Sequence, residues 1–160
     1  MMDFSYQLPD DFLSGPGPEI QKHIINFKET ALPEYDGKYA CILDNVLTAS
    51  ECAKLIRAAE ARTNGQWEQA LINVGMNQQK LMTDVRSCGR IIWDDQALVS
   101  KIWTRCERLV PEIFDLKDKP GITGLGPARK GYTYKLTRLN ERMRFLSYVE
   151  GNYFRRRSFT

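Results

Sequence analysis

Apolar and polar residues alternate most regularly in one segment near the end of the chain, from Arg142 to Tyr148. Successive side chains of a strand point to opposite faces, so this alternation predicts a strand with two different faces. One face would carry Arg144, Leu146 and Tyr148, and the other Met143, Phe145 and Ser147. A glycine turn is predicted after this strand, before the arginines that follow Phe154.

Two segments have the spacing of amphipathic helices. The first has a capping box at Thr48 and Glu51 and is predicted to end near Asn64-Gly65. The second begins after Asp94 or Asp95, either of which can cap it, and a proline stops it. Its apolar positions follow the helical period and are Leu98, Val99, Ile102, Trp103, Cys106, Leu109 and Val110.

Shorter patterns predict further strands and loops. Strands are expected at Tyr39–Leu43, Trp67–Val74, the end of Arg86–Trp93, and Tyr132–Leu139. The glutamine-rich MNQQK segment and residues 115–131 are expected to be loops, and the latter lack the spacing of a phosphate-binding loop. Residues 1–33 are interrupted by proline and glycine and read as a partly irregular leader, and residues 34–160 read as the domain.

The order of these elements indicates the fold class. Helices do not alternate regularly with strands and no internal repeat is present, which disfavours a doubly wound parallel sheet. Helices on one side of an antiparallel sheet fit the order better. We therefore predict an α+β fold in which helices support the strands of a jelly roll.

Composition and charge narrow the class of protein. The chain has 160 residues, 42% of them hydrophobic and 27% charged, which is enough for one domain with a modest core. A formal net charge of +3 is too small to indicate a nucleic-acid partner. No signal peptide and no membrane-spanning window is seen, so we expect a cytoplasmic or nuclear protein with no membrane partner.

Residues that commonly carry metal or nucleophilic chemistry are sparse. The four cysteines are widely spaced and form no C-x-x-C pair, which favours free thiols over a zinc site or a disulfide scaffold. The single histidine, His23, has no nucleophile elbow to complete a triad and cannot by itself supply a two-histidine metal site.

Three segments taken in order carry a resemblance to a known family. They read ILDNVLTASECAKLI, RSCGRIIWDDQALVSKIW and LNERMRFLSYVEGNYF. Their order and spacing, over residues 39–154, resemble the prolyl 4-hydroxylase-like branch of the iron(II)- and 2-oxoglutarate-dependent dioxygenases. The resemblance implies a double-stranded β-helix, or jelly roll, of about eight strands backed by N-terminal helices, with only its first part present in this chain.

The same resemblance implies a chemistry and a set of cofactors. Family members hold Fe(II) with an H-x-D pair and a second histidine, bind 2-oxoglutarate, use ascorbate, and hydroxylate a protein or small-molecule substrate. Tyr148 matches a tyrosine of the 2-oxoglutarate pocket, and Arg144 would line the substrate entrance. Arg86 and Arg90 are further candidates for substrate contacts.

The residues expected to bind iron do not match the family. Continuing the alignment past Phe154 and Arg155 places Arg157 at the first histidine and Phe159 at the aspartate. A guanidinium has no lone pair to donate and a phenyl ring has no donor atom, so neither can ligate iron. No metal ligand, no bound cofactor and no turnover are therefore expected of this chain, whose status as an enzyme is left open.

Three interpretations follow. The first is a dioxygenase chain in which a frameshift or retained intron replaced the metal-binding continuation. The second is a non-catalytic remnant that binds a partner, or itself, through exposed strand edges. The third is a small binding module that uses the basic tail Arg155–Arg157 on an acidic partner or nucleic acid. The first is preferred, and it includes no nucleic-acid partner.

Overall fold

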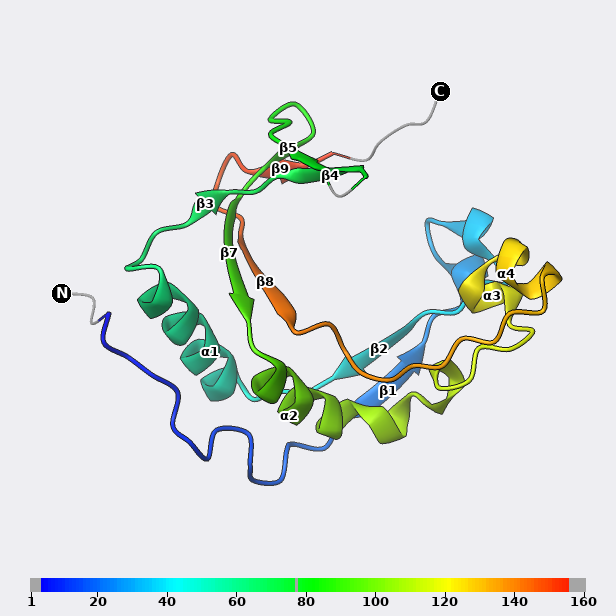
Figure 1. The fold of residues 1–160 in the computed structure, drawn as a ribbon, viewed down its shortest axis with the longest axis horizontal. Coiled ribbons are helices and arrows are strands. Elements are labelled where there is room, and N and C mark those ends of the chain that lie inside the picture. The colour runs from blue at the N-terminus through cyan, green and yellow to red at the C-terminus, as the bar shows by residue number, and fades with distance from the viewer. Residues whose placement is uncertain (1–3, 77, 156–160) are drawn as a thin grey trace. The chain divides into compact units, whose positions relative to one another are not determined.

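The alternating segment near the end of the chain forms strand β8 (Arg142–Ser147), which pairs antiparallel with β7 (Gly89–Asp94) in the computed structural model (Figure 1). The structure describes residues 4–76 and 78–155. Strand β3 (Glu68–Gln69) pairs with the other side of β7, which gives a three-stranded sheet in the order β3-β7-β8. The predicted strand and the alternation of its faces are confirmed.

Two units divide the chain. Unit 1 consists of Met1–Phe12, Ser50–Gln96 and Glu141–Thr160, and unit 2 consists of Leu13–Ala49 and Ala97–Asn140. Each unit is assembled from segments that are distant in sequence. The three-stranded sheet belongs entirely to unit 1.

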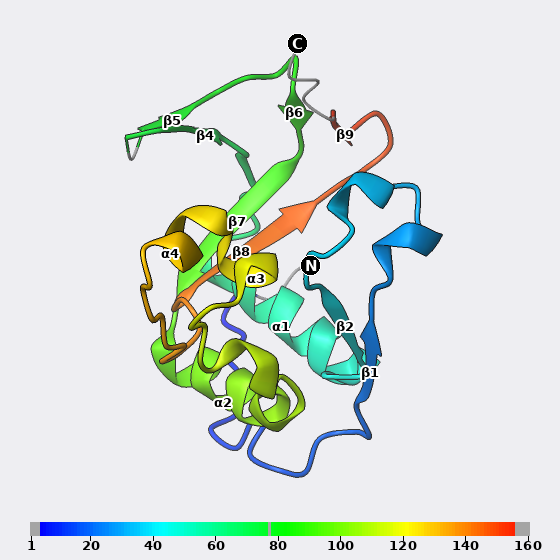
Figure 2. The same ribbon diagram turned by 90° about the vertical axis from the view of Figure 1, so that its right-hand side faces the viewer.

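Helix α1 (Ala49–Arg62) covers one face of the three-stranded sheet (Figures 1 and 2). On this face Ile91 is paired with Phe145, and Trp93 stacks on Phe145 with ring centroids 6.1 Å apart. The guanidinium carbon of Arg62 lies 4.8 Å from the centre of the Trp93 ring. Small residues on α1, including the fully buried Ala59, allow the helix to approach the sheet closely.

The predicted end of this helix is confirmed. The backbone N–H of Gly65 donates to the Glu60 carbonyl at 2.8 Å, and Gly65 adopts φ 75°. A side chain at this position would also meet the ring of Phe4 at 2.8 Å. Glycine is therefore required here both by the left-handed backbone and by the close approach of Phe4.

The remaining strands of unit 1 form two short ribbons. One pairs β4 (Ile72–Gly75) with β5 (Gln78–Lys80), and the other pairs β6 (Arg86–Ser87) with β9 (Tyr153–Phe154). Two predictions are wrong here: residues 67–74 do not form one strand, and Gln78–Lys80 of the glutamine-rich segment form a strand where a loop was expected. Ala70, which lies between β3 and β4 in the sequence, is buried, and its backbone N–H donates to the Cys88 carbonyl. The β4–β5 pairing shifts register between Asn73 and Gly75.

Unit 2 contains a two-stranded ribbon and several helices. The ribbon pairs β1 (Gln21–Ile24) with β2 (Cys41–Asp44). The helices are α2 (Gln96–Cys106, whose first residue belongs to unit 1), α3 (Pro120–Thr123) and α4 (Leu125–Arg129), with 3-10 turns at Phe27–Glu29, Pro33–Tyr35, Glu107–Leu109 and Pro111–Ile113. Strand β1 lies within residues 1–33, the stretch expected to be a partly irregular leader.

Three sequence predictions in unit 2 need correction. Residues 115–131 were expected to be a loop but contain α3 and α4, and α3 begins after Lys119 with Pro120 in its first turn. Residues 132–139 form no strand and make only an isolated bridge from Lys135 to Asp115. An alternating segment needs a neighbouring strand along its length, and this one has only a short partner. The α-helix before Pro111 ends at Cys106 and continues as a 3-10 turn.

The element content is α+β, as predicted, with antiparallel pairing in every described ribbon and sheet. Within residues 4–76 and 78–155, no helix has both the length and the apolar character required to cross a membrane.

A cluster of hydrogen bonds around Glu112 ties the parts of unit 2 together. Its carboxylate accepts from Lys22 Nζ at 2.5 Å and from the Tyr39 hydroxyl at 3.1 Å. Its carbonyl accepts from Lys119 Nζ at 2.7 Å. The hydrogen bond from Lys22 is the largest cause that lowers the pKa of Glu112, and burial is the largest cause that raises the pKa of Tyr39.

We expect Ile91→Ala to destabilise unit 1 by about 2–5 kcal/mol, because the side chain is 1% exposed and its loss leaves a cavity beneath α1. Amide hydrogen exchange in β7 and β8 measures the effect. Ile42→Ala is the matched control, since Ile42 in β2 is 49% exposed and should cost no more than about 0.5 kcal/mol. Equal losses for both variants would contradict this assignment of the core.

Acid should weaken unit 2 through Glu112. Because the folded-state pKa of Glu112 is lowered, its contribution is complete above the ordinary glutamate pKa of about 4.3 and is lost as pH falls through the lowered value. The measurement is urea unfolding of the wild type and of Glu112→Gln at several acidic pH values, monitored by hydrogen exchange in β1 and β2. The variant should lose less stability on acidification, and an unchanged pH dependence would be evidence against this role.

Candidate functional site

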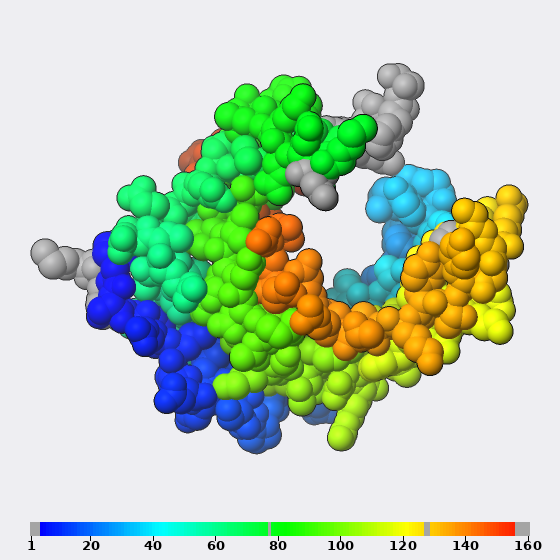
Figure 3. Space-filling model, viewed as in Figure 1, coloured from blue at the N-terminus to red at the C-terminus, as the bar shows by residue number. Residues whose placement is uncertain are grey.

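The sheet of unit 1 has a second face that carries three arginines. Paired residues of β7 and β8 share a face, and on the side opposite α1 these pairs are Arg90 with Leu146, Ile92 with Arg144, and Asp94 with Arg142. We call these six residues the arginine face. Every β8 residue on it is exposed, whereas the alternate residues of β8 are half-buried. Atoms of β8, coloured orange, lie on the surface in Figure 3.

A cluster of three polar side chains adjoins the arginine face at the end of β8. Arg86 Nε donates to Cys88 Sγ at 3.1 Å. The Tyr148 hydroxyl lies close enough to Cys88 and to the Arg86 guanidinium for both groups to affect its pKa. The predicted residues Arg86 and Tyr148 are thus brought together, although they are distant in the sequence. Tyr148 directly follows the last residue of β8.

The backbone places Tyr148 above Cys88. β7–β8 pairing ends with Gly89 opposite Ser147, and β6–β9 pairing resumes with Ser87 opposite Tyr153. Between these two paired regions, one chain segment therefore has the single residue Cys88, whereas the opposite segment has residues 148–152. This longer segment folds back on itself, with the Asn152 N–H donating to the Val149 carbonyl at 2.9 Å and the Val149 N–H donating to Asn152 Oδ1 at 3.1 Å.

The electrostatics of the cluster favour a neutral tyrosine beside a charged arginine. The hydrogen bond to Cys88 and burial raise the pKa of Tyr148, against an opposing effect of Arg86. Burial lowers the pKa of Arg86, but its hydrogen bonds to Cys88 and Tyr148 outweigh burial and raise it. The Arg86 guanidinium also lies 5.1 Å from the centre of the Phe154 ring. At neutral pH the cluster therefore presents one cation and a phenolic hydroxyl, a pair that can bind an anion but not a metal ion.

Arg90 has a different environment from the other predicted residues. It is 5% exposed, and its guanidinium donates to Glu68 Oε1 at 2.9 Å and to Gln79 Oε1 at 3.2 Å. These bonds connect β7 to β3 and to the β4–β5 ribbon. A buried arginine whose donors hold neighbouring strands in place is suited to support the face rather than to contact a substrate.

Arg144 lies at the centre of the arginine face, opposite Ile92. Its neighbour on the same face, Arg142, donates twice to the Asp94 carboxylate, at 2.8 and 2.7 Å. The hydrogen bond from Arg142 is the largest cause that lowers the pKa of Asp94, and the charge of Arg144 adds a smaller contribution. The described residues offer Arg144 no carboxylate at hydrogen-bonding distance, so its guanidinium is available at the surface.

The residues that align with the iron ligands of the family cannot be placed. Arg157 and Phe159 lie outside the described residues. His23 lies in unit 2, where its Nε2 is 3.3 Å from Asp44 Oδ2 across the β1–β2 ribbon. Among the described residues no group of three or more His, Cys, Asp or Glu side chains is arranged to hold a metal ion. The candidate residues Arg86, Arg90, Arg144 and Tyr148 include neither a histidine nor a carboxylate, the groups that the resemblance implies as iron ligands.

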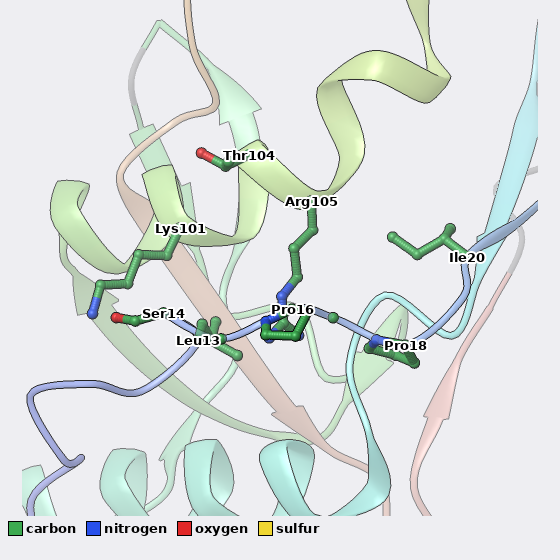
Figure 4. A pocket seen from close by; sticks show the side chains of 10 residues that line it. Leu13, Ser14, Pro16, Pro18, Ile20, Lys101, Thr104 and Arg105 are labelled. Atoms are coloured by element: carbon green, nitrogen blue, oxygen red, sulfur yellow. The ribbon is translucent and has the colours of Figure 1, made fainter.

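A pocket of about 580 Å³ lies in unit 2, apart from these residues (Figure 4). Residues 13–18 and Ile20 form one wall, and Lys101, Thr104 and Arg105 of α2 form the other. A side chain at Gly17 would meet Arg105 Nε at 3.0 Å, so glycine allows this segment to pass close to the helix. The pocket contains none of the residues singled out from the sequence.

Sequence reasoning missed Cys88, which is 1% exposed and links Arg86 to Tyr148. A signal for it was present, because Cys88 alternates with Arg86 and Arg90 at every second position. The contacts of Arg90 with Glu68 and Gln79 had no comparable signal, since they depend on how separate strands pair.

Comparisons with known proteins add no family to this geometry. No protein-family model, no curated protein and no solved structure matches the chain. The dioxygenase resemblance therefore depends on the three sequence segments, and the roles of Tyr148, Arg144, Arg86 and Arg90 stay predictions.

We expect Cys88→Ala to lower the pKa of Tyr148, because the hydrogen bond to Cys88 is the largest cause that raises it. Carbon-13 NMR of labelled tyrosines over alkaline pH measures the shift, and Tyr148→Phe identifies the resonance. Cys52→Ala is the matched control, since Cys52 is exposed on α1 and should leave the Tyr148 titration unchanged. An unaltered Tyr148 titration in Cys88→Ala would refute the hydrogen bond.

Proposed function

We propose that this chain supplies the support helix and first strands of a dioxygenase-like jelly roll and has no catalytic activity of its own. The observation that carries the proposal is the two-sided sheet of unit 1. Helix α1 backs one face, and the opposite face presents Arg144 and Leu146, with Tyr148 continuing from the same strand. In a jelly roll the face that is not backed by helices lines the ligand cavity.

The arrangement of polar groups is consistent with an ancestral anion site. A guanidinium and a phenolic hydroxyl lie together at Arg86 and Tyr148, and 2-oxoglutarate carries carboxylates that such groups bind. In this chain, however, Arg86 is hydrogen-bonded to Cys88, and Cys88 also interacts with Tyr148. A ligand carboxylate would have to displace those interactions, which reduces any gain in binding free energy.

The lack of suitable metal ligands supports the non-catalytic part of the proposal. Iron in this family needs two histidines and a carboxylate, whereas the sequence contains His23 alone and has arginine and phenylalanine at the aligned positions 157 and 159. No reaction step is therefore assigned to any residue of this chain. The substrate class of the family, a protein or a small molecule, would not be turned over.

A second candidate function is binding of a protein partner. Apolar side chains gather around the end of β8, where Leu146 is 42% exposed, Val149 66% and Phe154 64%. Exposed apolar groups next to a strand edge are typical of an interaction surface. The third interpretation, a basic tail, has less support, because Arg155 stacks on Tyr153 at 4.8 Å and Arg156 and Arg157 lie outside the described residues.

Purified chain, reconstituted with Fe(II) without oxygen and then desalted, should retain far less than one equivalent of iron. It should also release no succinate from 2-oxoglutarate in the presence of ascorbate and oxygen. Elemental analysis and succinate quantification measure these outcomes, with an active dioxygenase treated identically as the positive control. Stoichiometric iron, or succinate release that Tyr148→Phe abolishes, would overturn the proposal.

A further inference from the structure

Strand β8 is an edge strand of the three-stranded sheet. The order β3-β7-β8 leaves one long side of β8 without a partner strand among the described residues. Backbone N–H and C=O groups on such a side can pair with another extended chain. At six residues, β8 is long enough to offer several of these groups in regular register.

The side chains of β8 specify what kind of chain would fit. On its exposed face Arg144 lies between Arg142, which is already paired with Asp94, and Leu146, which is 42% exposed. A strand added beside β8 would place its own side chains next to these at alternate positions. The charge at Arg144 favours an acidic residue, and Leu146 favours an apolar residue two positions away on the same face.

We propose that β8 binds an extended acidic peptide of a partner protein by strand addition, with a carboxylate of the peptide on Arg144 and an apolar side chain beside Leu146. The backbone of β8 supplies the affinity, and the Arg144 guanidinium supplies the preference for acid. The proposal does not depend on the dioxygenase proposal, since it requires no metal, no 2-oxoglutarate and no residue beyond the described sheet.

A second copy of this chain fits the same edge less well. An antiparallel pairing of two β8 strands centred on Arg144 would place two guanidinium groups directly opposite each other, and like charges in that position are destabilising. Arginines along an edge strand therefore act against self-pairing while still allowing an acidic strand to bind. The expected self-association through strand edges becomes an alternative outcome of the test.

The probe is a fluorescein-labelled, end-capped peptide of sequence Thr-Val-Thr-Glu-Thr-Val-Thr, in which valine and glutamate share one face. Fluorescence anisotropy with the full chain should show saturable binding that weakens as salt is added. Arg144→Glu should weaken it roughly tenfold, because an attractive cross-strand pair becomes a repulsive one. Arg129→Glu is the matched control, since this exposed arginine lies on α4 of unit 2 and should leave binding unchanged.

Two further probes test strand addition itself. Replacing the glutamate of the peptide by glutamine should weaken binding to the wild type but not to Arg144→Glu. Methylating alternate backbone nitrogens should abolish binding in one of the two frames and preserve it in the other, since only one set of N–H groups faces β8. Equal binding in both frames, or an Arg144→Glu variant that binds as tightly as the wild type, would overturn the proposal. So would a dimer that excludes the peptide.

Discussion

The antiparallel pairing of β7 with β8 is the constraint on which the architecture of unit 1 depends. It joins segments from opposite ends of a long connection, and its register decides which side chains share a face. With Ile91 opposite Phe145, the apolar side chains of both strands share the face that α1 covers. A shift of one residue would turn Arg144 and Leu146 toward the helix and expose Phe145, so burial of the apolar face fixes the position of the arginine face.

The same pairing creates the polar cluster at the end of the sheet. Residues 148–152 lie opposite the single residue Cys88, so this longer segment must fold back on itself. The fold places the hydroxyl of Tyr148 near Cys88 and Arg86. Arg86 and Tyr148 are the predicted residues that the structure brings together within the described chain. The buried thiol of Cys88 lies between them and accepts a hydrogen bond from Arg86. An anion bound at this cluster would have to displace the hydrogen bond from Arg86 to Cys88.

In unit 2, polar contacts join distant segments alongside buried apolar side chains such as Leu98, Val99 and Val110. Glu112 accepts hydrogen bonds from Lys22 and Tyr39, residues far from it in sequence, and its own carbonyl accepts one from Lys119. Such a cluster resists separation of its parts but depends on the charge of one carboxylate. Ile24 and Ile42 of the β1–β2 ribbon are 62% and 49% exposed, which is consistent with a small apolar contribution from that ribbon.

The sequence by itself determined the elements whose signals are local. The strand at Arg142–Ser147, the end of α1 shortly before Gly65 and the start of α2 after Asp95 follow from alternation, a left-handed glycine and helical spacing. The α+β class followed from their order. Of the candidate site, strand parity predicted that Arg144 and Tyr148 share a face, because parity needs no knowledge of the partner strand. Which face is exposed came only from the structure.

Only the tertiary structure decided which alternating segments find a partner and which side chains meet. Residues 132–139 alternate well but make a single bridge at Lys135, whereas Gln78–Lys80 pair with β4 as β5, across a register shift between Asn73 and Gly75. Arg90 resembles Arg144 in sequence, yet it is buried against Glu68 and Gln79. Hydrogen bonding between strands and burial of a guanidinium depend on residues distant along the chain, so no local pattern could have distinguished the two arginines.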